Sequence, residues 1–86
     1  MRFLVHAAVR PGADAMPLLP AETTHVQELI ADGTAEQAYV RADHTGAYLV
    51  INTRDLTAAE QAMQTLPMTK AGFLDFTYVE LVPSSS

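Results

Sequence analysis

Residues 73–82, near the end of the chain, alternate in the manner of a β-strand, yet apolar side chains fall on both alternating faces. A strand of this kind must be covered on two sides. A chain of 86 residues is expected to bury only about 60% of the surface that its unfolded form exposes. One chain of this size is therefore poorly able to cover both faces, and we expect a second subunit.

The rest of the chain predicts three more strands and two helices. Residues 2–10 alternate, with Phe3, Val5 and Val9 on one face and His6 on the other. A helical pattern over residues 18–31 tolerates Pro20 in its first turn. Two more strands and a second helix are indicated by the patterns over residues 35–42, 47–53 and 57–66.

Local signals set the ends of these elements. Thr57 and Glu60 have the spacing of a capping box, which predicts that the second helix starts there, and Pro67 predicts its end. Residues 43–46, which include His44, predict the turn of a hairpin. The order is βαββαβ, so we predict an α+β, ferredoxin-like domain over residues 1–83 and a polar tail over residues 84–86.

This fold is a four-stranded antiparallel sheet, in the strand order 4-1-3-2, with both helices on one face. The other face would remain apolar and open. A second copy packed against it would give a dimeric α/β barrel with room for a small ligand between the sheets. We therefore predict a homodimer or a higher homo-oligomer.

The composition excludes several classes of function. A formal net charge of −5 with five lysines and arginines argues against nucleic acid and anionic membranes as partners and favours a neutral or cationic small molecule. The chain has no cysteine, which leaves metal binding to three histidines, and we predict no metal site. It has no glycine-rich phosphate loop, so we expect no cofactor. No segment is apolar enough to span a bilayer, and we expect a cytoplasmic protein.

The alternation also selects candidate site residues, which we expect on the open face of the sheet. The catalytic candidates are His6, Glu80 and Tyr48, and the substrate-binding candidates are Tyr39, Arg41, Asn52, Phe76 and Tyr78. An imidazole can move a proton beside a carbonyl, a carboxyl can act as acid or base, and phenol or guanidinium donors can hold an oxyanion. Each residue also has a structural interpretation, such as core histidine, packing tyrosine or solvated strand end.

Two further groups are less informative. Glu22 and His25 lie three residues apart on the first predicted helix, near the expected mouth of the cavity. Their spacing resembles half of a metal site, but no second half is found, and a solvated helix shoulder explains them. Asp75 is expected on the helix-facing side of the last strand, which is an unusual place for a carboxylate.

Several motifs resemble the muconolactone delta-isomerase family of the dimeric α/β-barrel superfamily. They are the helix end at residues 29–33, the hairpin, Thr65-Leu66-Pro67-Met68 and the closing strand at residues 78–83. The resemblance implies an enzyme that moves a proton within a small lactone, enone or phenolic compound without a cofactor. Two alternatives stay open: a non-catalytic binding or sensing module, and a cofactor-free monooxygenase acting on an aromatic polyketide-like substrate.

Overall fold

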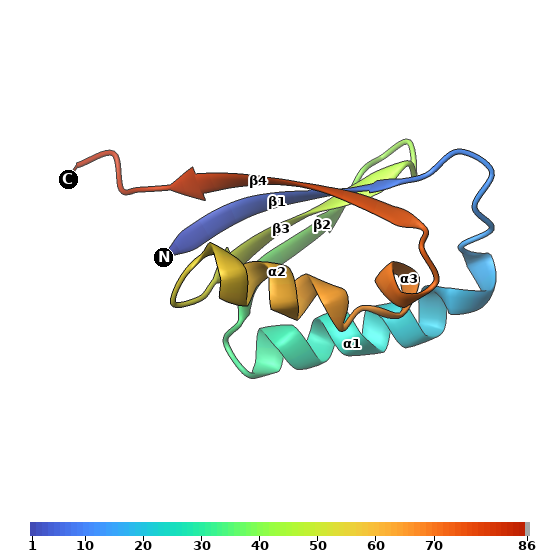
Figure 1. Ribbon diagram of the computed structural model, residues 1–86, viewed down its shortest axis with the longest axis horizontal. Coiled ribbons are helices and arrows are strands. Elements are labelled where there is room, and N and C mark those ends of the chain that lie inside the picture. The colour runs from blue at the N-terminus through green and yellow to red at the C-terminus, as the bar shows by residue number, and fades with distance from the viewer. Residues whose placement is uncertain (86) are drawn as a thin grey trace.

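The computed structural model describes residues 1–85, and the predicted βαββαβ order is confirmed. Two small elements are added to it, a 3-10 turn η1 before the first helix and a short helix α3 before the last strand. The elements are β1 (Arg2–Val9), η1 (Met16–Leu18), α1 (Leu19–Ala31), β2 (Ala35–Val40), β3 (Gly46–Asn52), α2 (Leu56–Gln64), α3 (Pro67–Lys70) and β4 (Leu74–Leu81) (Figure 1). Of the predicted polar tail, Ser86 lies outside the described residues.

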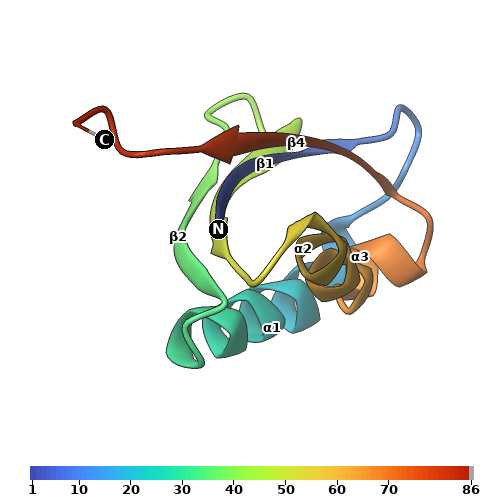
Figure 2. The ribbon, with the colours of Figure 1, turned by 60° about the vertical axis from the view of Figure 1, so that its left-hand side comes forward.

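The strands form one antiparallel sheet in the order β2-β3-β1-β4, as predicted. All three α-helices lie on one side of this sheet, which curves over them (Figures 1 and 2). The apolar core fills the space between the two layers, with Val5, Ile51, Met63 and Leu66 fully buried. The chain therefore has an α+β, ferredoxin-like fold.

The first helix is punctuated as the sequence predicts. Pro20 lies in the first turn of α1, where its missing N–H is not needed. After α1, Gly33 has a φ of +86°, and the Asp32 side chain accepts a hydrogen bond of 2.9 Å from the backbone N–H of Thr34. Residues other than glycine rarely adopt this φ, and a glycine in the left-handed conformation commonly ends a helix. The chain therefore leaves α1 here, and β2 can begin.

The predicted capping box of the second helix is wrong. Asp55 is the N-cap of α2, and its carboxylate accepts a 2.8 Å hydrogen bond from the backbone N–H of Ala58. A carboxylate cap two residues upstream places Thr57 within the first turn and removes its capping role. The helix does end before Pro67, and Pro67 then begins α3, because its fixed φ suits a first helical turn.

Strand pairing shows which residues share a face, since directly opposite residues in an antiparallel pair point the same way. His6 lies opposite Tyr48, and Tyr48 lies opposite Tyr39. These three residues are on the side of the sheet away from the helices, as predicted. We call that side the outer face; it includes Leu4, His6, Gln37, Tyr39, Tyr48, Val50, Asn52, Asp75, Thr77 and Val79.

The face predicted for the last strand is wrong. Tyr78 lies opposite Val5, Phe76 opposite Ala7 and Glu80 opposite Phe3, so these three side chains point to the helix side. Asp75 is instead on the outer face, where its Oδ1 lies 2.8 Å from Nη2 of Arg10. The prediction failed because β4 carries apolar residues on both faces, so its alternation does not distinguish them.

The longest helix is α1, with 13 residues. Within the part of the chain that the structure describes, no helix combines the length and apolar character needed to cross a membrane.

Candidate functional site

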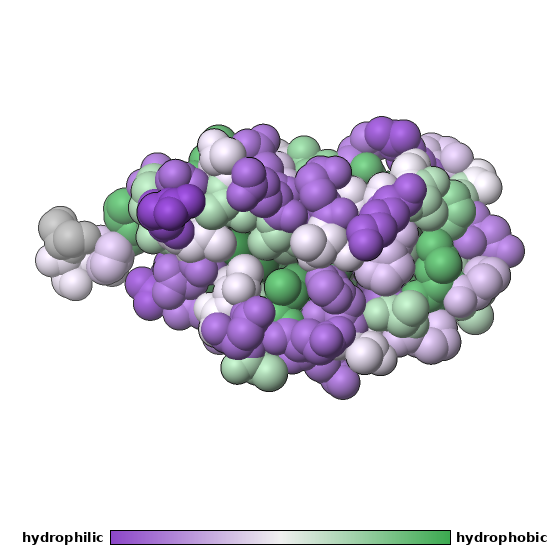
Figure 3. All heavy atoms as spheres, turned by 60° about the horizontal axis from the view of Figure 1, so that its bottom comes forward, coloured by the Kyte–Doolittle hydropathy of each residue, from purple (hydrophilic) through white to green (hydrophobic). Residues whose placement is uncertain are grey.

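A cavity of about 770 Å³ lies between the sheet and the N-terminal half of α1, on the helix side. The segment that leads through η1 into α1 and the turn between β2 and β3 contribute to its walls. In a view from the helix side, apolar atoms gather at the end where η1 enters α1 (Figure 3). The sequence analysis expected a cavity on the outer face, between two subunits, and did not predict this second hollow on the helix side.

Small side chains open this space. The sheet presents Ala7, Ala38 and Ala47 beneath α1, and none of these reaches far toward the helix. The buried residue of α1 is Leu29, near the end of the helix, whereas Leu19 in its first turn is exposed. The helix therefore packs closely at one end and leaves a hollow at the other.

Glu22 is the half-buried carboxylate of this cavity. Its Oε1 accepts a 2.9 Å hydrogen bond from the backbone N–H of Met68, at the start of α3. Burial raises the pKa of the Glu22 carboxyl, while the Met68 N–H and the nearby His25 act in the opposite direction. A carboxylate with a raised pKa is a better proton acceptor, so this group can serve as a general base or acid.

His25 lies beside Glu22 and is held by a threonine. Its Nε2 is 2.6 Å from Oγ1 of Thr65, and the Thr65 hydroxyl donates its proton to the carbonyl oxygen of Ala62 at 2.6 Å. Because that hydroxyl proton is already used, the Thr65 oxygen accepts, and His25 donates from Nε2. His25 does not line the cavity, so the predicted pair is divided between the cavity wall and the helix shoulder.

Other polar groups in the lining are Asp14, Thr23, Gln27 and His44. His44 is in the turn between β2 and β3, as predicted, and has a φ of +59°. This left-handed conformation is uncommon for residues other than glycine, and asparagine, aspartate and histidine adopt it more often than the rest. A strained backbone at a cavity wall is a feature that functional sites often show.

The outer face brings four of the predicted residues together. The rings of His6 and Tyr48 stack with centroids 4.5 Å apart. Arg41 interacts with both Asp43 and Tyr48, and its Nη2 lies 2.9 Å from Oδ2 of Asp43. Tyr39 lies opposite Tyr48 on the neighbouring strand. This group of His6, Tyr39, Arg41 and Tyr48 is called the outer-face cluster below.

A buried nitrogen stands out in the outer-face cluster. Nε2 of His6 is buried and has no hydrogen-bond partner among the described residues. It lies over Gly46, where an added Cβ would be 3.3 Å from it. A polar atom in this position is unusual, because buried polar groups are normally hydrogen-bonded.

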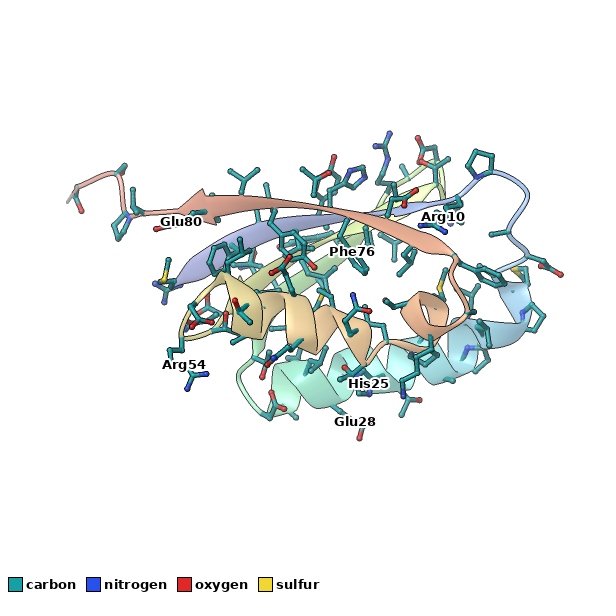
Figure 4. The ribbon with its side chains drawn as sticks, in the orientation of Figure 1. Arg10, His25, Glu28, Arg54, Phe76 and Glu80 are labelled. Atoms are coloured by element: carbon teal, nitrogen blue, oxygen red, sulfur yellow. The ribbon has the colours of Figure 1, made fainter. Side chains whose placement is uncertain are left out.

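The remaining predicted residues do not join the outer-face cluster. Asn52 is opposite Arg2, at the other end of β3. Phe76 points to the helix side (Figure 4). Phe76 and Tyr78 both pack against the core, and burial raises the pKa of the Tyr78 hydroxyl. Glu80 is exposed near the end of β4. Of the predicted site residues, Tyr39 lines the helix-side cavity.

Sequence reasoning missed five polar residues of the cavity as site residues: Asp14, Glu22, Thr23, Gln27 and His44. The available signal was the set of alanines that alternate with larger residues on β1, β2 and β3. Small residues on one face of a sheet under a helix indicate either close packing or a hollow, and the sequence does not decide between them.

The similarity of this chain to known proteins is found in its structure. No protein-family model and no curated protein sequence matches the chain. The 5-chloro-2-hydroxyhydroquinone dehydrochlorinase of Burkholderia phenoliruptrix AC1100, solved with 2,5-dihydroxybenzoquinone, matches 99% of this chain and 97% of its own with a TM-score of 0.84 and 18% identity. Muconolactone isomerase matches 100% of this chain and 94% of its own with a TM-score of 0.81 and 25% identity.

The fold and its cavity thus define an α+β, ferredoxin-like domain with a hollow under its first helix. Both structural neighbours are of the muconolactone isomerase-like, dimeric α/β-barrel family, and the resemblance found in the sequence is confirmed.

Proposed function

We propose that this protein is an enzyme of the isomerase or lyase type that acts on a small lactone, enone or phenolic compound without a cofactor. Glu22 carries the proposal, because it combines cavity lining, burial, a raised pKa and a fixed position on the Met68 N–H. The two structural neighbours, an isomerase and a dehydrochlorinase, support this class.

The chemistry requires one proton-transfer group and a donor for a developing oxyanion. The Glu22 carboxylate takes a proton from a carbon next to the substrate carbonyl, and the C–H electron pair forms an enolate. In an isomerase, Glu22 returns the same proton to another carbon of the conjugated system. In a lyase, the enolate expels a leaving group with its electron pair, and Glu22 later releases the proton to water.

The enolate oxygen needs a hydrogen-bond donor within the cavity. Thr23 and Gln27 supply a hydroxyl and an amide from α1, and His44 supplies an imidazole from the opposite wall. The apolar residues of the lining cover part of the ring of the substrate and reduce its contact with water, which strengthens these polar contacts.

A second location for the reaction is the outer-face cluster. His6 is its catalytic candidate, and the buried, unpartnered Nε2 favours it. This face has no helix over it (Figure 2), so a site here needs a second subunit as its cover. We propose a homodimer in which the two outer faces pack together, because exposed Val79 and Tyr39 leave apolar area on this face.

An absorbance assay with muconolactone and with 5-chloro-2-hydroxyhydroquinone tests the proposal. We expect turnover of at least one compound, a loss of about 100-fold or more in kcat for Glu22→Gln, and little change for the substitution Glu60→Gln at an exposed position of α2. The variant His6→Ala distinguishes the two locations. If His6→Ala is inactive and Glu22→Gln remains active, the reaction takes place on the outer face.

Failure would also be informative. If either compound binds saturably but is not turned over, the protein is a non-catalytic binding module and not an enzyme. A kcat that is unchanged in both Glu22→Gln and His6→Ala would contradict a proton transfer at either location.

A further inference from the structure

The lining of the helix-side cavity carries carboxylates but no permanent positive charge. Asp14 and Glu22 both line it, while its other polar side chains are uncharged or imidazole. The chain has five lysines and arginines, and none of them lines the cavity. A ligand in this cavity therefore meets negative charge and hydrogen-bond donors, but no guanidinium or ammonium group.

The arginines cannot easily be recruited, because each already has a carboxylate beside it. The nitrogen–oxygen distances are 2.7 Å for Arg2–Glu36, 2.8 Å for Arg10–Asp75, 2.9 Å for Arg41–Asp43 and 3.7 Å for Arg54–Asp55. Arg10 also donates to the carbonyl oxygen of Gly72 at 3.0 Å. Lys70 is exposed in the last turn of α3.

An anionic ligand would face two penalties in this cavity. Its charge would lose water against a lining that is mostly apolar, with no cation to replace the lost hydration. It would also lie near Glu22, whose own charge is already disfavoured by burial. Like charges brought together in such surroundings discriminate strongly against binding.

From this lining we infer the substrate class: the cavity selects uncharged ring compounds that carry hydroxyl or carbonyl groups, and it rejects compounds with an ionised carboxylate. The inference rests on the proposed function only in taking the same cavity as the site. It separates the two compounds of the assay, because muconolactone carries a carboxylate and 5-chloro-2-hydroxyhydroquinone does not.

A matched pair of ligands tests this without any turnover. Methyl 4-hydroxybenzoate and 4-hydroxybenzoate share one ring and differ at pH 7 mainly in a carboxylate charge. Titrating each into ¹⁵N-labelled protein and following amide shifts gives both the affinity and the location. We expect the ester to shift amides of cavity residues such as Ala47, Leu49 and Val26 and to bind at least about tenfold more tightly than the acid.

Two charge-matched variants locate the cause. Glu22→Gln removes one negative charge from the cavity and should reduce the ratio of the affinity for the ester to the affinity for the acid by about threefold or more. Glu60→Gln removes one negative charge from the exposed surface of α2 and should leave the ratio unchanged. An equal reduction in both variants would show that net charge, and not the cavity, makes the selection.

Three other results would overturn the inference: an acid that binds as tightly as the ester, an ester that does not bind at millimolar concentration, or shifts confined to the outer face. Its failure differs from failure of the proposed function. Binding of the ester without turnover of any compound would contradict the enzymatic function but support the selection for uncharged ligands. Turnover of muconolactone in this cavity would support the enzymatic function but contradict that selection.

Discussion

The backbone N–H of Met68 donates a hydrogen bond of 2.9 Å to Oε1 of Glu22, which joins the first turn of α3 to the first turn of α1. The candidate base is thus positioned by two helices. Because α3 is only four residues long, this contact also helps to hold α3 in place.

Replacing Glu22 by alanine should therefore destabilise the fold, whereas glutamine should be tolerated. Alanine leaves the Met68 N–H without its acceptor in a partly buried position, which costs about 1–2 kcal/mol of unfolding free energy. Glutamine keeps an acceptor oxygen at the same place. Urea denaturation at pH 7 measures both variants, and an equal loss in the two would show that charge, not the hydrogen bond, matters.

His44 should be replaceable by residues that accept its backbone conformation. With φ at +59°, glycine or asparagine relieves strain, and we expect His44→Gly or His44→Asn to raise the unfolding free energy by about 0.5–1 kcal/mol. His44→Ala has the same strain as the native residue and should change little. Thermal or urea unfolding compares the three, and a gain in stability for alanine as well would contradict the backbone explanation.

Gly46 should tolerate no larger residue. A Cβ there would lie 2.5 Å from the carbonyl oxygen of Ala7 and 3.3 Å from Nε2 of His6. The first contact is with backbone in the centre of the sheet, so Gly46→Ala should cost about 2–3 kcal/mol of unfolding free energy.

The double variant Gly46→Ala, His6→Ala is the informative control. Removing the imidazole does not move the Ala7 carbonyl, so we expect no rescue of stability by His6→Ala. Recovery of the native unfolding free energy in the double variant would mean that the imidazole, not the backbone, requires glycine at this position.

Much of the fold could be predicted because its signals are local. Alternation in β1, the glycine after α1 and the proline after α2 mark their elements without help from distant residues. The faces of His6 and Tyr48 were also predictable, because their strands carry consistently buried residues on the other face.

The face of β4 was not predictable from its own residues. Phe76 and Tyr78 on one side and Val79 on the other are all suitable for a core, so only pairing with β1 decides which side is covered. The cavity was equally hidden, because it depends on how alanines from three strands meet beneath α1.

The pairing of β4 leads to a prediction about assembly. Val79 is on the outer face and 51% exposed, so Val79→Asp should break a homodimer while leaving the monomer folded. Phe76 packs against the core, and Phe76→Ala should instead destabilise each chain by about 2–3 kcal/mol. Light scattering and circular dichroism distinguish these effects, and native protein that is monomeric at 100 micromolar would refute the proposed dimer.

The raised pKa of Glu22 predicts how stability depends on pH. Between the ordinary glutamate pKa of 4.5 and the higher value in the fold, the folded chain binds more protons than the unfolded chain. The contribution of this carboxyl to stability is therefore complete below pH 4.5 and declines as pH rises through the folded pKa. Glu22→Gln lacks this decline and keeps the other carboxylates, so their effects cancel when the two proteins are compared.

We expect the unfolding free energy of the native protein, relative to Glu22→Gln, to be largest near pH 4 and to fall toward pH 8. The measurement is a series of urea denaturations of both proteins, with Glu60→Gln as the reference for removal of one exposed charge. Asp43 and Asp75 have lowered pKa values from their arginine partners and affect all three proteins alike. A difference between native protein and Glu22→Gln that stays constant from pH 4 to pH 8 would show that burial does not disfavour the Glu22 charge.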